Sequence, residues 1–143
     1  MKRCFEFLNL TPIASPHTYT RADKRSIRDF YLHKNYSEML KLAEGYKTFE
    51  DRPWNMWSMY RHLHERFPDS RFILTVRDPE SWWRSTERWI TVTKPHILKR
   101  YQLHLRVHQP SKESMIESSL RYNEEVKEYF QNAGNLLVIN FEK

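Results

Sequence analysis

Blocks of apolar residues along the chain predict strands and helices in alternation. The block 71–76, RFILTV, contains four apolar residues without regular polar alternation, which is typical of a strand covered on both faces of a parallel sheet. Residues 46–49 and 136–141 predict two further strands. The segments between the strands are long enough to form crossover helices. The order strand–helix–strand–helix–strand therefore predicts an α/β fold with a parallel sheet.

Capping residues and apolar spacing locate the helices of the first half. Between Asp23 and Gly45 the sequence predicts helix in one or two pieces, with Ser37 as the cap of the second piece and Gly45 as its end. A helix from Pro53 is expected because apolar residues recur at spacings of four, three and four, at Met56, Tyr60, Leu63 and Phe67. Residues 1–10 are typical of the end of an amphipathic helix, and residues 11–22 predict a loop.

Two later helices have clearer start signals. Asp78 can cap a helix that begins at Pro79 and continues to about Ile90. Ser111 can cap a long helix that Gly134 ends. Between them, residues 91–110 are basic and rich in histidine, which is typical of a cover over a ligand site or of a solvated helix.

Composition limits the class of protein. With 143 residues and neither a repeat nor a linker, the chain is expected to form one domain, residues 1–143. A formal net charge of +6 favours an anionic ligand, nucleic acid or a membrane surface. The single cysteine, Cys4, excludes an internal disulfide, and no apolar run is long enough to span a membrane. No spacing of histidine, cysteine or acidic residues resembles a metal site, so no metal is expected.

Arg77 and Ser85 are the candidate ligand-binding residues. Arg77 directly follows the strand 71–76, at the carboxyl end where open α/β sheets bind their ligands. Ser85 lies two turns into the next helix, on the same side as that strand end. A guanidinium and a hydroxyl that converge there suit a phosphate group, provided that Arg77 is not buried against an internal acid. The alternative is an ordinary strand-to-helix junction with a solvated arginine.

The sequence Arg-Asp-Pro, with a serine eight positions after the arginine, resembles the 3′-phosphate-binding motif of sulfotransferases that use 3′-phosphoadenosine 5′-phosphosulfate (PAPS). The resemblance covers DRPWNMWSMYRHLHERFPDSRFILTVRDPESWWRS, and more weakly NLLVINFEK at the end. It implies a P-loop nucleotide-hydrolase-like fold, a three-layer parallel sheet flanked by helices. It also implies an enzyme in which Arg77 and Ser85 bind the 3′-phosphate of PAPS. The sulfuryl group would pass to a hydroxyl or amine of a small-molecule or glycan acceptor.

The chain departs from that family in its glycines. Only Gly45 and Gly134 are present, and neither lies in a loop that could hold the 5′-phosphosulfate. We therefore expect a domain that is incomplete at both ends, or a degenerate relative that is inactive alone. In such a fold the first strand lies at the centre of the sheet. Strands 71–76 and 136–141 are then expected to pair directly, to be covered by a second chain in an oligomer, or to be poorly stable.

Asp51 is the candidate catalytic residue. In the cytosolic steroid and phenol sulfotransferases a catalytic histidine stands two residues before a proline at the end of a strand, and here Asp51 stands two residues before Pro53. The resemblance implies that this carboxylate is the general base for the acceptor. The alternative is a helix N-cap. The nearby Trp54 and Trp57 either wall the acceptor pocket or, by default, pack in the core.

Two other functions fit the same sequence. A nucleic-acid-binding module would use the basic segment 91–110, whereas the sulfotransferase interpretation expects no nucleic acid. A non-catalytic partner subunit would keep the sheet without the phosphate loop. The single cysteine and the charged first residues favour a cytoplasmic location, with attachment in a lumen through a preceding segment left open.

Overall fold

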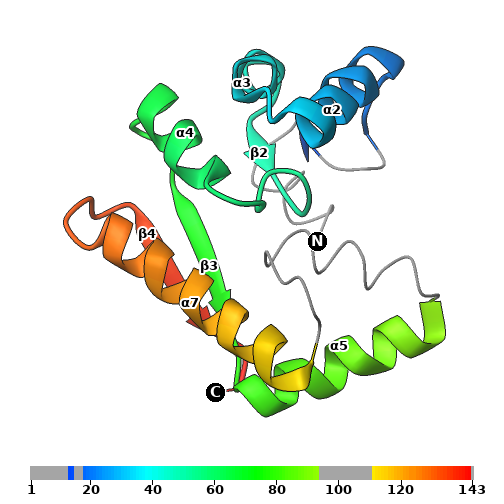
Figure 1. Cartoon of the computed structure of the whole chain (residues 1–143). Helices are drawn as coiled ribbons and strands as arrows, with labels where there is room; N and C mark the ends of the chain where they lie inside the picture. The colour runs from blue at the N-terminus through cyan, green and yellow to red at the C-terminus, as the bar shows by residue number, and fades with distance from the viewer. Residues whose placement is uncertain (1–12, 15–17, 94–110, 143) are drawn as a thin grey trace. The chain divides into compact units, whose positions relative to one another are not determined.

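The computed structural model describes residues 13–14, 18–93 and 111–142. The chain divides into two units, Met1–Pro68 and Asp69–Lys143. Within these described residues, each unit contains one pair of parallel strands together with helices (Figure 1). The expectation of a single domain stays a prediction. The predictions for Cys4, for residues 1–10 and for most of the basic segment 91–110 concern residues outside the described part of the chain.

The first unit contains, in chain order, strand β1 (Ile13–Ala14), helix α2 (Arg21–His33), helix α3 (Tyr36–Ala43), strand β2 (Thr48–Phe49) and helix α4 (Met59–Arg66). β1 and β2 run parallel, with Ile13 opposite Thr48 and Ala14 opposite Phe49. β2 confirms the short strand predicted at residues 46–49. β1 lies in a segment that was predicted as a loop, because its pairing partner is distant in the sequence and leaves no local signal.

Helices α2 and α3 confirm the prediction of two helical pieces. The Thr20 side chain accepts a hydrogen bond from the Asp23 N–H at 3.2 Å, and the Asp23 carboxylate accepts one from the Thr20 N–H at 2.6 Å. This reciprocal pair begins α2. α3 is capped by Asn35, not by Ser37, which lies inside its first turn. The cap comes earlier because Lys34, with φ 54°, ends α2 in the left-handed region and leaves room for only a short connection.

The predicted helix start at Pro53 is wrong. Residues 51–58 form turns, and α4 begins only at Met59. Asp51 has φ 58° and Trp57 has φ 49°, which are left-handed values that a right-handed helix does not include. The preference of proline for a first helical turn is therefore overridden in this segment.

Aromatic packing in the first unit explains that override. The ring of Trp57 lies 5.1 Å from the ring of Phe30, which is fully buried, measured between centroids. The ring of Trp54 lies 4.5 Å from that of Phe49. Both tryptophans are buried, so they belong to the core, as expected by default, and do not wall an open acceptor pocket. Burying both indoles fixes the backbone between them.

The second unit contains, in chain order, strand β3 (Phe72–Val76), helix α5 (Pro79–Thr93), helix α7 (Lys112–Phe130) and strand β4 (Leu136–Asn140). β3 and β4 pair directly and in parallel, from Phe72 opposite Leu136 to Val76 opposite Asn140. Direct pairing is one of the three outcomes expected for these strands, and it is confirmed. Both strands and both helices lie close to their predicted positions.

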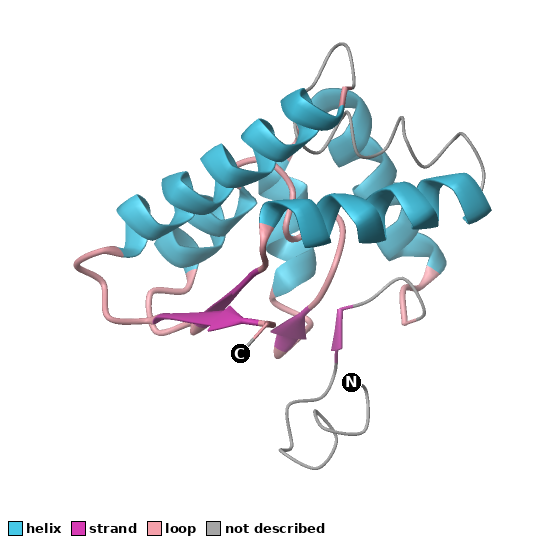
Figure 2. Ribbon diagram, turned by 90° about the horizontal axis from the view of Figure 1, so that it is seen from below, coloured by secondary structure: helices cyan, strands magenta, loops and turns pink. Residues whose placement is uncertain are grey.

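Helix α7 packs on one face of the β3–β4 pair (Figure 2). Phe130 of α7 packs against Phe72 with 4.6 Å between ring centroids, and Leu74 is buried on the same face. On the opposite face, Ile73 is 63% and Leu137 is 57% exposed. The prediction that β3 is covered on both faces is therefore wrong. An apolar run shows that a strand favours burial, whereas the cover itself must come from other elements.

The helix starts in the second unit agree with the sequence. The Asp78 carboxylate accepts a hydrogen bond from the Ser81 N–H at 2.9 Å and so caps α5. At the start of α7 the side chains of Ser111 and Ser114 each accept from the other's backbone N–H. Gly134, with φ 69°, supplies the left-handed residue that leads from α7 into β4.

The described residues thus form an α/β structure with two pairs of parallel strands. Its helices are either too short or too polar to cross a lipid bilayer, as far as the structure describes them.

Candidate functional site

The carboxyl ends of β3 and β4 bring Arg77 and Glu142 together. Val76 and Asn140 are paired in register at the ends of the two strands, so the residues that follow them leave the strands at the same edge. Arg77 Nε donates a hydrogen bond to Glu142 Oε1 at 3.2 Å. The two side chains are 41% and 33% exposed. Arg77 therefore contacts an acid without being buried against it, and its guanidinium stays accessible to a ligand.

Two more donors reach the Glu142 carboxylate. Its Oε2 accepts a hydrogen bond from the Asp78 N–H at 3.2 Å. A hydrogen bond from the Ser81 side chain is the largest single cause that holds the pKa of Glu142 below its usual value, followed on the lowering side by those from Arg77 and Asp78. The dipole of α5, which begins at the next residue, also favours negative charge there. A guanidinium, a backbone N–H and a hydroxyl thus converge on one oxyanion.

Ser85 lies on α5 one turn beyond Ser81 and is exposed. Residues four apart share a face of a helix, so Ser85 lies on the side of α5 that carries Ser81 and its contact with Glu142. Among the described residues, no hydrogen bond joins the side chains of Ser85 and Arg77. Arg77 and the face of α5 that carries Ser85 therefore lie on the same side of the strand-to-helix junction.

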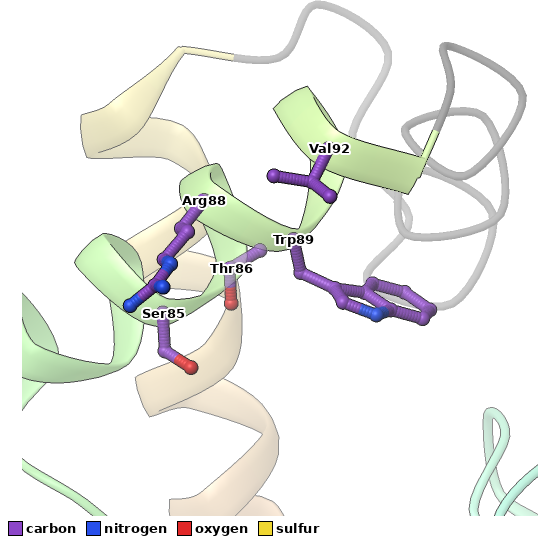
Figure 3. Close-up of a pocket in the computed structure, with 5 residues that line it drawn as sticks. All are labelled: Ser85, Thr86, Arg88, Trp89 and Val92. Carbon is purple, nitrogen blue, oxygen red and sulfur yellow. The ribbon is translucent and has the colours of Figure 1, made fainter.

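A hollow of about 380 Å³ borders Ser85 on α5. It is lined by Ser85, Thr86, Arg88, Trp89 and Val92 (Figure 3). Figure 3 shows Ser85 and Arg88 on one side of it and the Trp89 indole on the other. Thr86 is buried, whereas Arg88 and Trp89 are exposed. The hollow therefore offers a cation, a hydroxyl and an aromatic face beside the predicted phosphate ligand Ser85.

Asp51 lies in the first unit, in the turn after β2. Its side chain is 63% exposed, and its Oδ1 lies 3.9 Å from Arg52 Nε. Its backbone carbonyl accepts a hydrogen bond from the Asn55 N–H at 3.3 Å. The alternative role as a helix N-cap is wrong, because α4 begins eight residues later, at Met59. An exposed carboxylate of this kind is able to accept a proton from a bound hydroxyl or amine.

Two partly buried phenols lie in the same unit as Asp51. Trp54 Nε1 donates to the Tyr19 hydroxyl at 2.7 Å, and burial raises the pKa of Tyr19 to about 12, with the Asp51 charge among the smaller contributions. Tyr46 donates to Asp23 Oδ2 at 2.9 Å, and burial followed by this hydrogen bond raises its pKa to about 12. Both phenols are therefore protonated at neutral pH. They serve as structural hydrogen-bonding groups and not as bases.

Sequence reasoning missed Glu142 and Ser81. The signal for Glu142 was its position directly after the predicted strand 136–141, since parallel strands bring their carboxyl ends to one edge of a sheet. The signal for Ser81 was its position one turn before Ser85. Neither signal identifies a partner without the register of the strands. Among the described residues, no group of three histidine, cysteine or acidic side chains could hold a metal ion.

Comparison with known proteins identifies one family. A family model described as a sulfotransferase domain matches residues 2–143, which is nearly the whole chain and includes Asp51, Arg77 and Ser85. No curated protein matches the sequence significantly.

Proposed function

The chain belongs to the sulfotransferase domain family, and we propose that it takes part in sulfuryl transfer from PAPS to a hydroxyl or amine of a small-molecule or glycan acceptor. The proposed fold is P-loop nucleotide-hydrolase-like, and β3, β4 and their helices form part of its three layers. The observation that carries the proposal is the Arg77 guanidinium, which lies accessible at the carboxyl end of β3 and already binds an oxyanion.

Arg77 and Ser85 bind the 3′-phosphate of the donor in this proposal. A guanidinium presents several N–H donors in a plane, which suits a phosphate that carries up to two negative charges. Ser85 adds a hydroxyl from the same side of α5. This half of the site fixes the nucleotide and lies away from the sulfur that is attacked. The sequence has only two glycines, so we assign no residue of this chain to a glycine-rich loop for the sulfate end.

Asp51 is the proposed base. The acceptor oxygen or nitrogen attacks the sulfur, the bond from sulfur to the bridging phosphate oxygen breaks, and adenosine 3′,5′-bisphosphate leaves. The acceptor's proton passes to the Asp51 carboxylate. No metal is required, because transfer of this kind depends mainly on positioning and on stabilising the developing charge. The sequence-based prediction that a second chain covers the open edge of the β3–β4 pair in an oligomer stays a prediction.

Binding of adenosine 3′,5′-bisphosphate, measured by isothermal titration calorimetry, tests the donor site. Arg77→Ala is expected to weaken binding about 10- to 100-fold, because a hydrogen bond to a charged group contributes about 1.5–3 kcal/mol. Arg84→Ala is the matched control, since Arg84 is an exposed arginine on α5, the helix that follows Arg77, and its loss changes the net charge equally. Unchanged binding by Arg77→Ala, or an equal loss in both variants, would refute the assignment.

A further inference from the structure

Glu142 stands where an external anion would be expected. Its carboxylate accepts from Arg77 Nε and from the Asp78 N–H, each at 3.2 Å, and it also bonds to the Ser81 hydroxyl. A phosphate oxyanion is bound by the same types of donor. On the basis of the proposed function, we propose that Glu142 is an internal competitor that occupies the position of the donor's 3′-phosphate, so that the nucleotide binds by displacing it.

Charge makes joint occupancy unfavourable. A phosphate that contacts Arg77 would lie within a few ångströms of the Glu142 carboxylate, and like charges at that separation repel each other. Two anions would also share one set of donors. The 3′-phosphate of the nucleotide therefore contacts Arg77 only after the Glu142 side chain has moved away from Arg77.

Displacement of Glu142 is easy because its contacts are at the surface. Both members of the Arg77–Glu142 pair are more than a quarter exposed, and exposed ion pairs contribute little to stability. Glu142 also follows β4 and is not part of the ladder, which ends at Asn140 opposite Val76. Its side chain can turn into solvent without the loss of a strand hydrogen bond.

Displacement of Glu142 makes a further hydrogen-bonding side chain accessible to the phosphate. When Glu142 leaves, the Ser81 hydroxyl and the Asp78 N–H lose their acceptor, and both lie beside Arg77 at the start of α5. Ser85 lies one turn further along the same face of the helix. Ser81 is therefore a direct phosphate ligand in the bound state, although its spacing from Arg77 does not fit the sequence motif.

The test is a calorimetric comparison of Glu142→Gln and Glu142→Ala with the wild-type chain, using adenosine 3′,5′-bisphosphate and adenosine 5′-monophosphate. Both variants are expected to bind the bisphosphate about three- to tenfold more tightly, with a smaller gain at high salt, because screening weakens the competing pair. Binding of the monophosphate should not change. Ser81→Ala should weaken bisphosphate binding in the wild-type and in the Glu142→Gln background. Glu125→Gln is the control for net charge, because Glu125 is an exposed residue of α7.

Each outcome separates the inference from the proposed function. If the wild-type chain binds and Arg77→Ala does not, but the Glu142 variants bind equally or more weakly, Glu142 orients Arg77 and the competitor role is wrong. If Glu125→Gln tightens binding as much, or if the monophosphate gains equally, the effect is general charge and the inference also fails. If neither the wild-type chain nor any Glu142 variant binds the bisphosphate, both the inference and the proposed function are wrong. Unchanged thermal unfolding midpoints exclude misfolding as the cause.

Discussion

Replacing Phe130 by alanine is expected to loosen the strand pair that carries Arg77 and Glu142. Phe130 is 3% exposed and packs against Phe72 at the start of β3. Full burial of a phenylalanine contributes about 1.5–3 kcal/mol, and an aromatic pair adds about 0.5–1.5 kcal/mol. With the cavity that remains, the loss should reach about 3–5 kcal/mol. This is a large part of the stability of an ordinary domain.

The assay is urea denaturation combined with hydrogen exchange of the β3 and β4 amides, which reports on the second unit directly. Leu120→Ala on the same helix is the matched control, because Leu120 is 43% exposed and should lose less than about 1 kcal/mol. Phe130→Leu keeps most of the apolar volume and should fall between the two. A loss in Phe130→Ala no larger than in Leu120→Ala would show that this contact does not hold α7 on the sheet.

Two further predictions concern the first unit. Asp51→Asn keeps the left-handed turn, which asparagine tolerates. It should lower the rate of adenosine 3′,5′-bisphosphate release from PAPS by about 10²–10⁴-fold, while donor binding measured by calorimetry stays unchanged. An unaltered rate would show that Asp51 is not the base. Tyr19 and Tyr46, with pKa values raised to about 12, stabilise the fold fully below their unfolded-state pKa of 10.0, and that contribution is lost as the pH rises toward 12. The unfolding temperature should therefore fall over this range, and less so in Tyr46→Phe; a constant midpoint would contradict the shifts.

Local chemistry is sufficient to predict most of the second unit. Asp78 and Ser111 cap α5 and α7 as expected, because a capping side chain bonds to a backbone N–H only three residues away. The apolar runs at 71–76 and 136–141 predict the strands β3 and β4 for a similar reason, since β-forming residues are concentrated there. The position of Arg77 at a strand end follows from these boundaries alone.

Contacts between residues distant in the sequence decided the features that local chemistry does not predict. β1 forms because β2 lies beside it, and the turn that contains Asp51 bends because two indoles are buried around it, against the preference of Pro53 for a helix start. The exposed face of β3 depends on which elements are present to cover it. The contact of Glu142 with Arg77 joins residues 65 positions apart. Such contacts depend on strand register and packing, which arise only when the whole chain is folded and have no counterpart in a local pattern.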